Sequence, residues 1–468
     1  MKITKHVQTY RRIYQRTVNF MMPVIYTLMF TYVWYNNLNS VIHGFINKGN
    51  LLIILMYFVI NYVALKLWNA FGIGMHKLVN VVVSQAMGVL FGNLATYLEL
   101  ILIGAHIDFL FVVFKNMLWL TLIQWVVALV IPYIFNTIYI HIFPPHKILQ
   151  INGDYDNDLG EKIKSREDRY QVCEEISIHE PWEEIEKKMR SYRAVLLNDL
   201  DAHEQVKIIK YCYAHSIRLY FTPKISDIII KGSDTINYFD SPLFVNRNIG
   251  LTIEQRIIKR TLDIVISLIG LIVASPIMLV TAICIKAYDH GPVFYRQERT
   301  TFRGKNFWMI KFRSMIENAE ADGKANPASD DDDRITPVGR FIRKTRIDEL
   351  PQLINILKGD MSIVGPRPER VEHMEKYAEV VPEFDYRLKV KGGLTGYAQV
   401  YGKYNTTPLD KLKMDLMYIV NYSLLLDIQI FFETVKVIFK NEATEGFTDK
   451  QKEKLNGGSE DLSDKSKC

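Results

Sequence analysis

Four long apolar stretches crowd the first 140 of the 468 residues, and they constrain the fold more than any other feature. They cover residues 18–34, 51–71, 81–103 and 109–140. Each is close to or above the roughly 20 residues that a helix needs to cross a bilayer. The links between them are too short to hold further domains. The sequence therefore predicts a four-helix transmembrane bundle over residues 1–140.

The charge that flanks these stretches predicts their orientation. Residues 1–16 carry five Lys or Arg and no acid, whereas the segment after the third stretch, "LELILIGAHID", holds acids and no Lys or Arg. Basic residues favour the cytoplasmic side. Both ends of the bundle are therefore expected in the cytoplasm. A cleaved signal peptide is not expected, because three more apolar stretches follow the first.

Strand-like and helix-like patterns alternate over residues 141–250. The segments "HKILQING", "YRAVLLND" and "SIRLYFTP" are typical of buried strands, and "AHEQVKIIKYCYAHS" is typical of a helix. Such alternation predicts a small, Rossmann-like parallel α/β domain. Its first turn has only Gly153 and lacks a G-x-G-x-x-G phosphate loop. A scaffolding domain is favoured over a dinucleotide site.

A further membrane element is expected within residues 251–442. The run 262–285 is largely apolar, is interrupted by Ser275 and Pro276, and has basic residues on both sides. A straight crossing would place the rest of the chain outside the cell, against the distribution of basic residues. Proline breaks the helical hydrogen-bond ladder. A re-entrant helical hairpin in the cytoplasmic leaflet is favoured over a fifth, kinked span.

A basic β-hairpin follows. Residues 293–299 and 306–313 are extended runs around "FRGK", with Gly304 in the turn. Lys311 and Arg313 are two residues apart and point to the same face of the second strand. An isolated hairpin of this kind would be a solvated basic surface. More basic residues follow in "GRFIRKTR", and this context weighs against a merely solvated surface.

Two adjacent carboxylates, Asp348 and Glu349, stand at the start of "DELPQLINIL". Arg343 and Arg346 lie just upstream of Asp348, so a lowered pKa is expected for its carboxyl group, which suits a nucleophile or a metal ligand. One or two carboxylates together with substrate phosphates form the usual Mg²⁺ site. Surface ion pairing is the alternative. Arg367, between two prolines in "GPRP", is placed to grip a phosphate.

From about residue 255 to residue 440 the chain resembles the bacterial sugar transferases, which are polyprenyl-phosphate hexose-1-phosphate transferases. The resemblance rests on the Ser-Pro break, "YRQER", "KFRSM", the long stretch from "DDDRITPVGR" to "GPRPE", "GLTGYAQV" and "DLMYIVNYSLLLDI". It implies a membrane protein of mixed α and α/β class: a four-helix bundle over 1–140, the α/β domain over 141–250 and an α-rich catalytic domain with a re-entrant helix over 251–442. Residues 443–468 are expected to be disordered.

The resemblance also implies the chemistry. Asp348 would attack the β-phosphate of a UDP-sugar, most simply UDP-glucose or UDP-galactose, and release UMP. Undecaprenyl phosphate would then accept the phosphosugar, which starts capsule, exopolysaccharide or O-antigen synthesis at the bacterial inner membrane. Mg²⁺ would bridge Asp348, Glu349 and the diphosphate. The residues expected to bind substrate are Lys311, Arg313, Arg343, Arg367, Asp415 and Asp427.

Two residues depart from the family pattern. Thr301 stands where glycine is expected, and Gly392 stands where proline is expected. Both are turn positions, so they affect loop geometry more than chemistry. The run of four aspartates at 330–333 is interpreted as a solvated acidic loop, in preference to a metal cluster.

Two alternatives belong to other functional classes. A direct glycosyltransferase would release UDP and not UMP, and its D-x-D metal site is absent apart from the acidic run. A non-enzymatic scaffold or regulator of polysaccharide assembly would leave the Asp-Glu pair, Lys311 and Arg367 without a purpose. No nucleic-acid partner is expected. A homodimer formed through the bundle or the α/β domain is a hypothesis.

Overall fold

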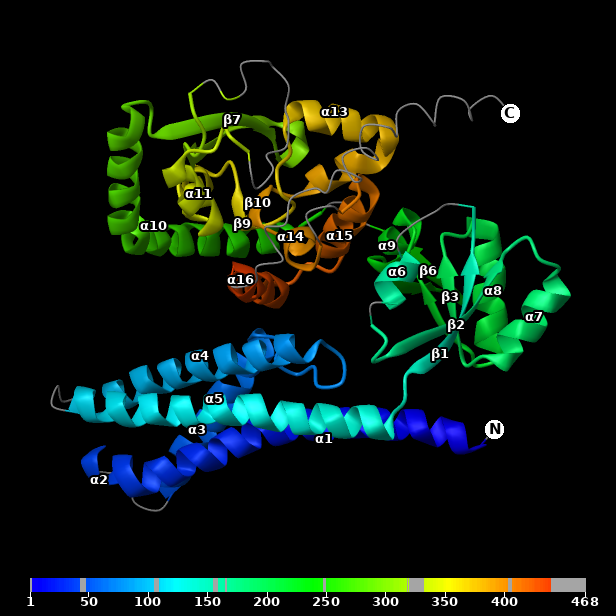
Figure 1. Cartoon of the computed structure of the whole chain (residues 1–468), viewed down its shortest axis with the longest axis horizontal. Coiled ribbons are helices and arrows are strands. Elements are labelled where there is room, and N and C mark those ends of the chain that lie inside the picture. Colours follow the sequence, from blue (N-terminus) through cyan, green and yellow to red (C-terminus); the bar gives the residue numbers. More distant parts are fainter. Residues whose placement is uncertain are drawn as a thin grey trace. The chain divides into compact units, whose positions relative to one another are not determined.

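The computed structural model describes residues 2–42, 48–104, 109–154, 159–164, 166–246, 250–317, 319, 332–402 and 406–438. The chain divides into two compact units, Met1–Pro223 and Lys224–Cys468 (Figure 1). The predicted tail, residues 443–468, lies outside the described residues. The predicted boundaries at 140, 250 and 442 stay predictions.

The first unit begins with a bundle of long helices. Four helices in the described chain are long and apolar enough to cross a membrane: Lys48–Leu67, Leu78–Gly104, Leu110–Ile142 and Ile253–Asp289. Three of these correspond to predicted spans of the bundle. The bundle elements are α1 (Lys2–Val33), η1 (Trp34–Leu38), α2 (Asn39–Ile42), α3 (Lys48–Leu67), α4 (Leu78–Gly104) and α5 (Phe109–Ile142).

The first predicted span, residues 18–34, lies mostly in α1, which is not among those four helices. Polar residues such as Thr27 interrupt its apolar run. α1 nevertheless packs into the bundle through polar contacts. The Tyr26 hydroxyl donates to Gln85 Oε1 at 3.0 Å, and Gln124 Nε2 donates to the Tyr26 carbonyl at 3.1 Å. Buried polar pairs of this kind fix how helices associate.

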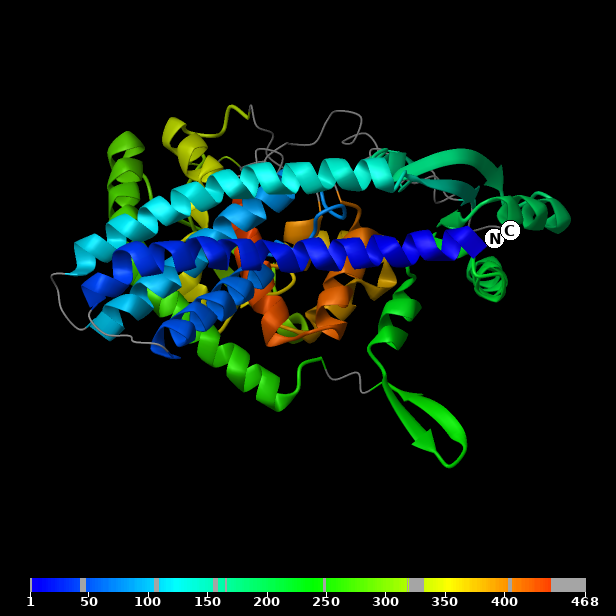
Figure 2. The same cartoon turned by 90° about the horizontal axis from the view of Figure 1, so that it is seen from below.

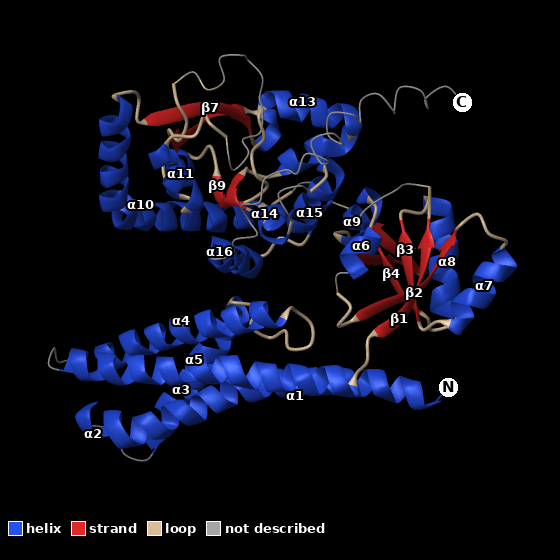
Figure 3. Cartoon of the chain, in the orientation of Figure 1, coloured by secondary structure: helices blue, strands red, loops and turns tan. Residues whose placement is uncertain are grey.

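A four-stranded parallel sheet completes the first unit, with strand order β2-β1-β3-β4. One face packs against α7 and α8, and the other packs against α6 (Figure 3). The predicted parallel α/β architecture is confirmed, and β2 is an additional strand. The elements are β1 (His146–Asn152), α6 (Leu159–Lys164), β2 (Tyr170–Ser177), α7 (Trp182–Ser191), β3 (Ala194–Asn198), α8 (Ala202–Ala214) and β4 (Arg218–Phe221).

The second unit begins with α9 (Ile225–Lys231) and an antiparallel hairpin, β5 (Asp234–Tyr238) and β6 (Ser241–Val245). Every residue of these two strands is exposed. Figure 2 shows the hairpin extending from α9 as a separate arm. It is therefore not part of the parallel sheet, although it lies within the range predicted for the α/β domain.

α10 (Ile253–Asp289) carries the predicted break at Ser275 and Pro276. Figure 1 shows α10 in two arms that run in different directions. Pro276 has no N–H to donate, and Ser275 Oγ donates to the carbonyl of Ile272 at 2.8 Å. The structure thus contains one bent helix through the proline. Re-entry of this helix into a single leaflet stays a prediction.

The polar side chains of the first arm of α10 bind the rest of the second unit. Arg260 Nη2 donates to the carbonyl of Leu357 at 2.7 Å, at the end of α12 (Gln352–Lys358). Asp263 Oδ1 accepts from the backbone N–H of Ile363 at 2.9 Å, in β9 (Ser362–Val364). α10 therefore exposes apolar residues such as Ile257 and Leu268, and its polar residues bind α12 and β9.

The remaining elements of this unit surround one apolar core, to which Ile356, Val364, Phe384 and Leu416 contribute. This core packs against the elements that carry the candidate site, including α12 and β9. Its elements are β7 (Phe294–Thr300), η2 (Phe302–Gly304), β8 (Asn306–Phe312), α11 (Pro337–Lys344), η3 (Ile347–Glu349), α13 (Val371–Val380), η4 (Pro382–Lys389), β10 (Gly393–Thr395), α14 (Tyr397–Tyr401), α15 (Pro408–Val420) and α16 (Leu424–Ile438).

Candidate active site

The β7–β8 hairpin confirms the predicted pair of strands and presents Lys311. The side chain of Asn355, in α12, holds the open edge of β8. Asn355 Oδ1 accepts from the N–H of Ile310 at 3.0 Å, and Nδ2 donates to the carbonyl of Trp308 at 2.8 Å. The side-chain amide of Asn355 thus makes the two backbone hydrogen bonds that a neighbouring strand would otherwise make. It fixes the segment that carries Lys311.

The Asp-Glu pair lies in the short helix η3, between α11 and α12. Arg346, just before it, has φ 59° and ψ 16°, a left-handed conformation that is uncommon for a residue with a side chain. This turn ends α11 and redirects the chain. Pro351 then starts α12 with φ −61°. The pair is therefore fixed between a left-handed residue and a proline.

Glu349 is the carboxylate that the basic residues hold. Arg367 Nη2 donates to Glu349 Oε1 at 2.7 Å, and Lys311 Nζ lies 3.6 Å from the same oxygen. Burial tends to raise the pKa of Glu349, but the charges of Arg367 and Lys311 outweigh it and hold the pKa well below its usual range. Burial lowers the pKa of Lys311 to about 8, against the attraction of Glu349. Glu349 therefore stays ionised.

Asp348 differs from its neighbour. It is buried, and its Oδ1 has no hydrogen-bond partner in the part of the chain that the structure describes. Burial, and then the charge of Glu349, raises its pKa, although Lys311, Arg346 and Arg343 oppose this. The lowered pKa expected for Asp348 is therefore wrong, and it is the pKa of the neighbouring Glu349 that is lowered. A desolvated carboxylate with a free oxygen is suited to nucleophilic attack.

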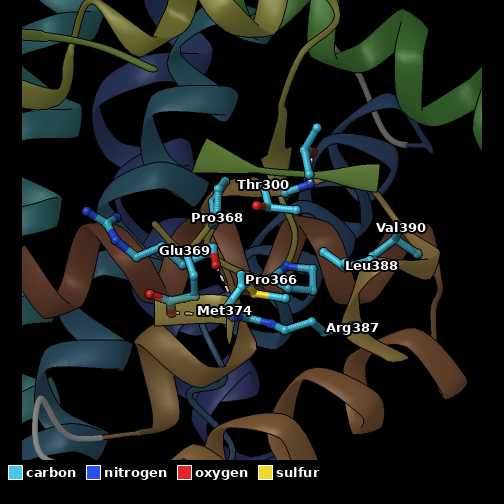
Figure 4. A pocket seen from close by; sticks show the side chains of 11 residues that line it. Thr300, Pro366, Pro368, Glu369, Met374, Arg387, Leu388 and Val390 are labelled. Atoms are coloured by element: carbon cyan, nitrogen blue, oxygen red, sulfur yellow. Dashed lines mark hydrogen bonds and ion pairs between the residues drawn. The ribbon is translucent and has the colours of Figure 1, made fainter. Parts of the chain in front are cut away.

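Arg367 is held in the Gly365–Glu369 turn by a buried arginine, Arg387. Arg387 Nη2 donates to the main-chain carbonyl of Arg367 at 2.9 Å, and Nη1 donates to Glu369 Oε1 at 3.4 Å. Figure 4 shows Pro366, Pro368, Glu369 and Arg387 around one small pocket. Its cavity is about 10 Å³, roughly the space of one water molecule. The pocket is therefore packed support for the turn and not a substrate cleft.

The two departures from the family pattern contact each other. The N–H of Gly392 donates to Thr301 Oγ1 at 3.0 Å. A proline at 392 would have no N–H, and a glycine at 301 would have no hydroxyl. A Cβ at Gly392 would lie 2.4 Å from Cγ of Pro368, so glycine also gives the "GPRP" turn room. The two departures thus depend on each other, because they form one hydrogen bond next to the turn that carries Arg367.

Several residues predicted to bind substrate lie in other contacts. Arg313 is buried and pairs with Asp289 at the end of α10. Asp415 forms an ion pair with Arg387 at 2.8 Å, and Asp427 forms one with Lys259 at 2.5 Å. These carboxylates and Arg313 have charged protein partners. The structure brings together Lys311, Arg343, Asp348, Glu349 and Arg367.

The acidic run at 330–333 lies partly outside the described residues, since Asp330 and Asp331 are not among them. Asp332 forms an ion pair with Arg334 at 2.6 Å. In the described chain, no cluster of three or more His, Cys, Asp or Glu side chains forms a metal site. The interpretation of the run as a metal cluster gains no support from these contacts.

Comparison with known proteins places the second unit in a family. The family model for bacterial sugar transferases matches residues 254–441. An uncharacterised sugar transferase of Bacillus subtilis is 38% identical over 186 residues, which are 40% of this chain and 89% of that protein. The chain belongs to the bacterial sugar transferase family. The predicted family is confirmed.

Two other sugar transferases carry more specific names. The UDP-glucose:undecaprenyl-phosphate glucose-1-phosphate transferase of Klebsiella pneumoniae is 42% identical over 219 residues, which are 46% of this chain and 45% of that protein. The UDP-N-acetylgalactosamine-undecaprenyl-phosphate N-acetylgalactosaminephosphotransferase of Aeromonas hydrophila is 45% identical over 184 residues, 39% of this chain and 43% of that protein. The chain thus spans less than half of the length of these two relatives.

The residues of this sugar transferase fit the magnesium ion that the resemblance implies. Mg²⁺ usually binds one or two carboxylates together with waters and substrate phosphates, so a dedicated three-residue cluster is not required. The unpartnered Oδ1 of Asp348 is a hard oxygen ligand. Glu349 beside it has its Oε1 engaged by Arg367. Asp348 therefore provides the free oxygen, and the substrate diphosphate would complete the site.

Sequence reasoning missed three residues of this region. Gln352 is fully buried, and neither its Oε1 nor its Nε2 has a hydrogen-bond partner among the described residues. Asn355 and Arg387 position β8 and the Arg367 turn. Gln352 and Asn355 could have been found, because they are polar residues in the otherwise apolar segment "QLINIL". Arg387 has no signal of its own in "EFDYRLK", since charged residues surround it.

Proposed function

We propose that the protein transfers a hexose-1-phosphate from a UDP-sugar to undecaprenyl phosphate and releases UMP. The observation that carries this proposal is the unequal environment of two adjacent carboxylates. Glu349 is ionised and bound by Arg367, whereas Asp348 is desolvated and has an oxygen without a partner. A carboxylate so arranged beside several cations suits attack on a phosphate.

The transfer proceeds in two displacements. An Asp348 oxygen bonds to the β-phosphorus, the bond from that phosphorus to the bridging oxygen breaks, and UMP leaves with the electron pair. An oxygen of undecaprenyl phosphate then attacks the same phosphorus and frees the Asp348 carboxylate. The product is a sugar joined to the lipid through a diphosphate.

The surrounding residues neutralise and position the phosphates. Lys311 and Arg367 lie against Glu349, so their charges face the reacting diphosphate, and Arg343 adds a further charge near Asp348. Preorganised cations of this kind lower the barrier to phosphoryl transfer. The Asp348 carboxylate would hold Mg²⁺, which would further neutralise the charge of the diphosphate. Arg387 and Asn355 keep the cations in position through the "GPRP" turn and β8.

We propose that this reaction takes place at the inner membrane, that the second unit lies in the cytoplasm, and that the product enters capsule, exopolysaccharide or O-antigen synthesis. The four long apolar helices of the described chain support a membrane location. The bent α10 would enter and leave the cytoplasmic leaflet on the same side. Single cysteines at Glu254, in the first turn of α10, and at Asn306, after α10, test this topology in a chain whose native cysteines are replaced by serine. Labelling of both from the cytoplasmic side only supports re-entry, whereas labelling from opposite sides means a full crossing.

Two further parts of the proposal are the identity of the donor sugar and the oligomeric state of the protein. The name of one relative specifies UDP-glucose and that of another specifies UDP-N-acetylgalactosamine, so the donors to be tested include these two and UDP-galactose.

The exposed β5–β6 hairpin, with Tyr238, Phe239 and Phe244 on its surface, supports a homodimer. Mass photometry of the purified chain measures its oligomeric state, and a monomer contradicts the dimer.

The covalent intermediate gives the direct test of this mechanism. The protein is incubated with Mg²⁺ and radiolabelled UDP-sugar without undecaprenyl phosphate, quenched and digested. A phosphosugar on the peptide that contains Asp348, absent in Asp348→Asn, is expected. A phosphosugar on another residue contradicts the role of Asp348 as nucleophile. UDP release without enzyme labelling contradicts the mechanism and favours a direct glycosyltransferase.

A further inference from the structure

A second cavity lies away from the candidate active site, between the start of α10, the β7–β8 turn and η4. Its volume is about 490 Å³, and it shares no residue with the Asp-Glu pair or with Lys311 and Arg367. We call it the basic pocket. It is lined by Arg256, Phe302, Arg303, Gly304, Asp385, Leu388 and Lys389.

The charge of the basic pocket favours an anion. Three of its residues, Arg256, Arg303 and Lys389, are cationic, and Asp385 is its one carboxylate. The three cations come from three different elements of the fold, α10, η2 and η4. Arg256 and Arg303 both lie over the ring of Phe302, with guanidinium carbons 5.7 Å and 5.0 Å from its centroid. The aromatic ring thus holds the two guanidinium groups together against their mutual repulsion.

The conformation of Arg303 is a second, independent sign. Arg303 has φ 58° and ψ 29°, and Gly304 follows with φ 74°. Two consecutive left-handed residues at a hairpin turn normally favour Asn-Gly or Gly-Gly. An arginine there is conformationally unfavourable, so local backbone geometry does not explain it. We take the presence of arginine at this position as a sign that its side chain has a function in the pocket.

The position of the pocket on α10 indicates the class of ligand. Arg256 stands in the first turns of this apolar helix, next to Ile253 and Ile257, which are 71% and 62% exposed. Ile253 and Ile257 are four residues apart and therefore lie on one helix face. A ligand with a phosphate on the cations would have apolar surface for its chains directly beside them. A free phosphate would leave that surface uncovered.

We propose that the basic pocket binds the phosphate headgroup of an anionic phospholipid, with the acyl chains against the exposed apolar face of α10. The bound lipid fixes the first arm of α10 at the bilayer surface. Arg260 of this arm donates to the carbonyl of Leu357 at the end of α12. The lipid therefore contacts α10, the same helix that holds α12 in the candidate active site. The proposal does not depend on the phosphosugar chemistry.

Lipid titration of the full chain in neutral detergent tests this. Bound lipid is counted by native mass spectrometry, and Tm is measured, with phosphatidylglycerol, phosphatidylcholine, or glycerol 3-phosphate added. Phosphatidylglycerol is expected to bind and raise Tm, and the other two are not. An equal effect of phosphatidylcholine overturns the proposal. An equal effect of glycerol 3-phosphate also overturns it, because the site would then serve a free phosphate.

Variants separate the pocket from general lipid contacts of the bundle. Arg303→Asn removes the charge and keeps a residue that tolerates the left-handed turn, so folding is preserved. Arg303→Asn and Lys389→Gln are each expected to weaken the phosphatidylglycerol effect roughly fivefold. Lys305→Gln is the matched control, since Lys305 is exposed on the same hairpin but does not line the pocket, and its effect is expected to stay unchanged. Equal weakening in the control, or none in the pocket variants, contradicts the proposal.

Discussion

The guanidinium of Arg367 donates a hydrogen bond to Oε1 of Glu349 at 2.7 Å, and this contact gives two adjacent carboxylates different properties. Glu349 is ionised and its charge is paired with Arg367, whereas Asp348 keeps an oxygen without a hydrogen-bond partner in the described chain. The sequence leads to the expectation that both residues bind Mg²⁺, and only the family resemblance singles out Asp348 as the nucleophile. The turn that presents Arg367 distinguishes the two carboxylates, because a fixed guanidinium reaches only one of them.

Replacing Arg367 with lysine tests the geometry of this contact. Arg367→Lys keeps the charge but loses the planar fork, so the ion pair with Glu349 loosens and a phosphate loses its bidentate partner. We expect kcat/KM for UMP release to fall about 100-fold. Arg340→Lys is the control, since Arg340 is exposed on α11. Equal activity of Arg367→Lys and the native protein would show that the contact has no catalytic part.

Asp415 distinguishes a positioning role from the substrate-binding role that the resemblance implies. Asp415 and Arg387 are almost fully buried and form an ion pair at 2.8 Å. Asp415→Asn removes one charged partner of Arg387, which we expect to destabilise the protein by about 3 kcal/mol. Thermal unfolding followed by tryptophan fluorescence measures this. A raised KM at unchanged Tm would support direct substrate contact instead.

Much of the fold was predictable because it depends on local patterns. Apolar length predicted three of the helices long enough to span, and alternating patterns predicted β1, β3, β4 and the β7–β8 hairpin. β2 was missed, because its sequence "YQVCEEIS" includes two acids. Pro276 lies inside α10, as the sequence indicated, and the position of the bend stays a prediction.

From the sequence, only those site residues that stand in a recognisable motif could be predicted. The Asp-Glu pair, Lys311 and Arg367 stand in recognisable motifs, and the structure brings them together. Arg313 and Asp415 also stand in motifs but are paired with other charges, which depends on contacts between distant segments. The opposite pKa shifts of Asp348 and Glu349 depend on burial and on Arg367, which lies 18 residues from Glu349.

The contact between Thr301 and Gly392 predicts a simple substitution pattern. Thr301→Val removes the hydroxyl that accepts from the Gly392 N–H and leaves that buried donor unsatisfied. We expect a loss of about 1–3 kcal/mol of stability. Thr301→Ser keeps the acceptor and is expected to retain most of the stability. Chemical denaturation of the two variants compares them directly. A Thr301→Ser variant as unstable as Thr301→Val would assign the effect to the lost methyl packing.

Glu369 predicts a loss of stability in acid. Burial tends to raise its pKa, but Lys411 and Arg387 outweigh this and lower the pKa below its ordinary value. A depressed folded pKa means that the stabilisation is complete above the unfolded value of about 4.3 and is lost as pH falls. Tm should therefore decrease between about pH 5 and pH 3. The titratable and charged groups that face Glu369 are Arg299, Arg367, His373, Arg387, Lys411 and Asp415.

The control for this pH dependence is Glu369→Gln. This variant is expected to be less stable at pH 7, because Lys411 and Arg387 lose a charged partner, and to show a shallower fall of Tm in acid. Burial raises the pKa of nearby Asp415, which acts in the opposite direction, so the difference between the two proteins is the quantity to compare. Parallel Tm curves would assign the acid sensitivity to other groups.

The most direct test of the central claim is nucleotide release by the purified protein. The protein in nanodiscs is supplied with Mg²⁺, undecaprenyl phosphate and separate UDP-sugars, and UMP and UDP are quantified. UMP formed with one donor, removed by chelation of Mg²⁺ and reduced at least about 1,000-fold in Asp348→Asn, is the predicted result. UDP as the product would identify a direct glycosyltransferase, and the absence of both nucleotides with every donor would indicate a scaffold. Either outcome would contradict phosphosugar transfer by this protein.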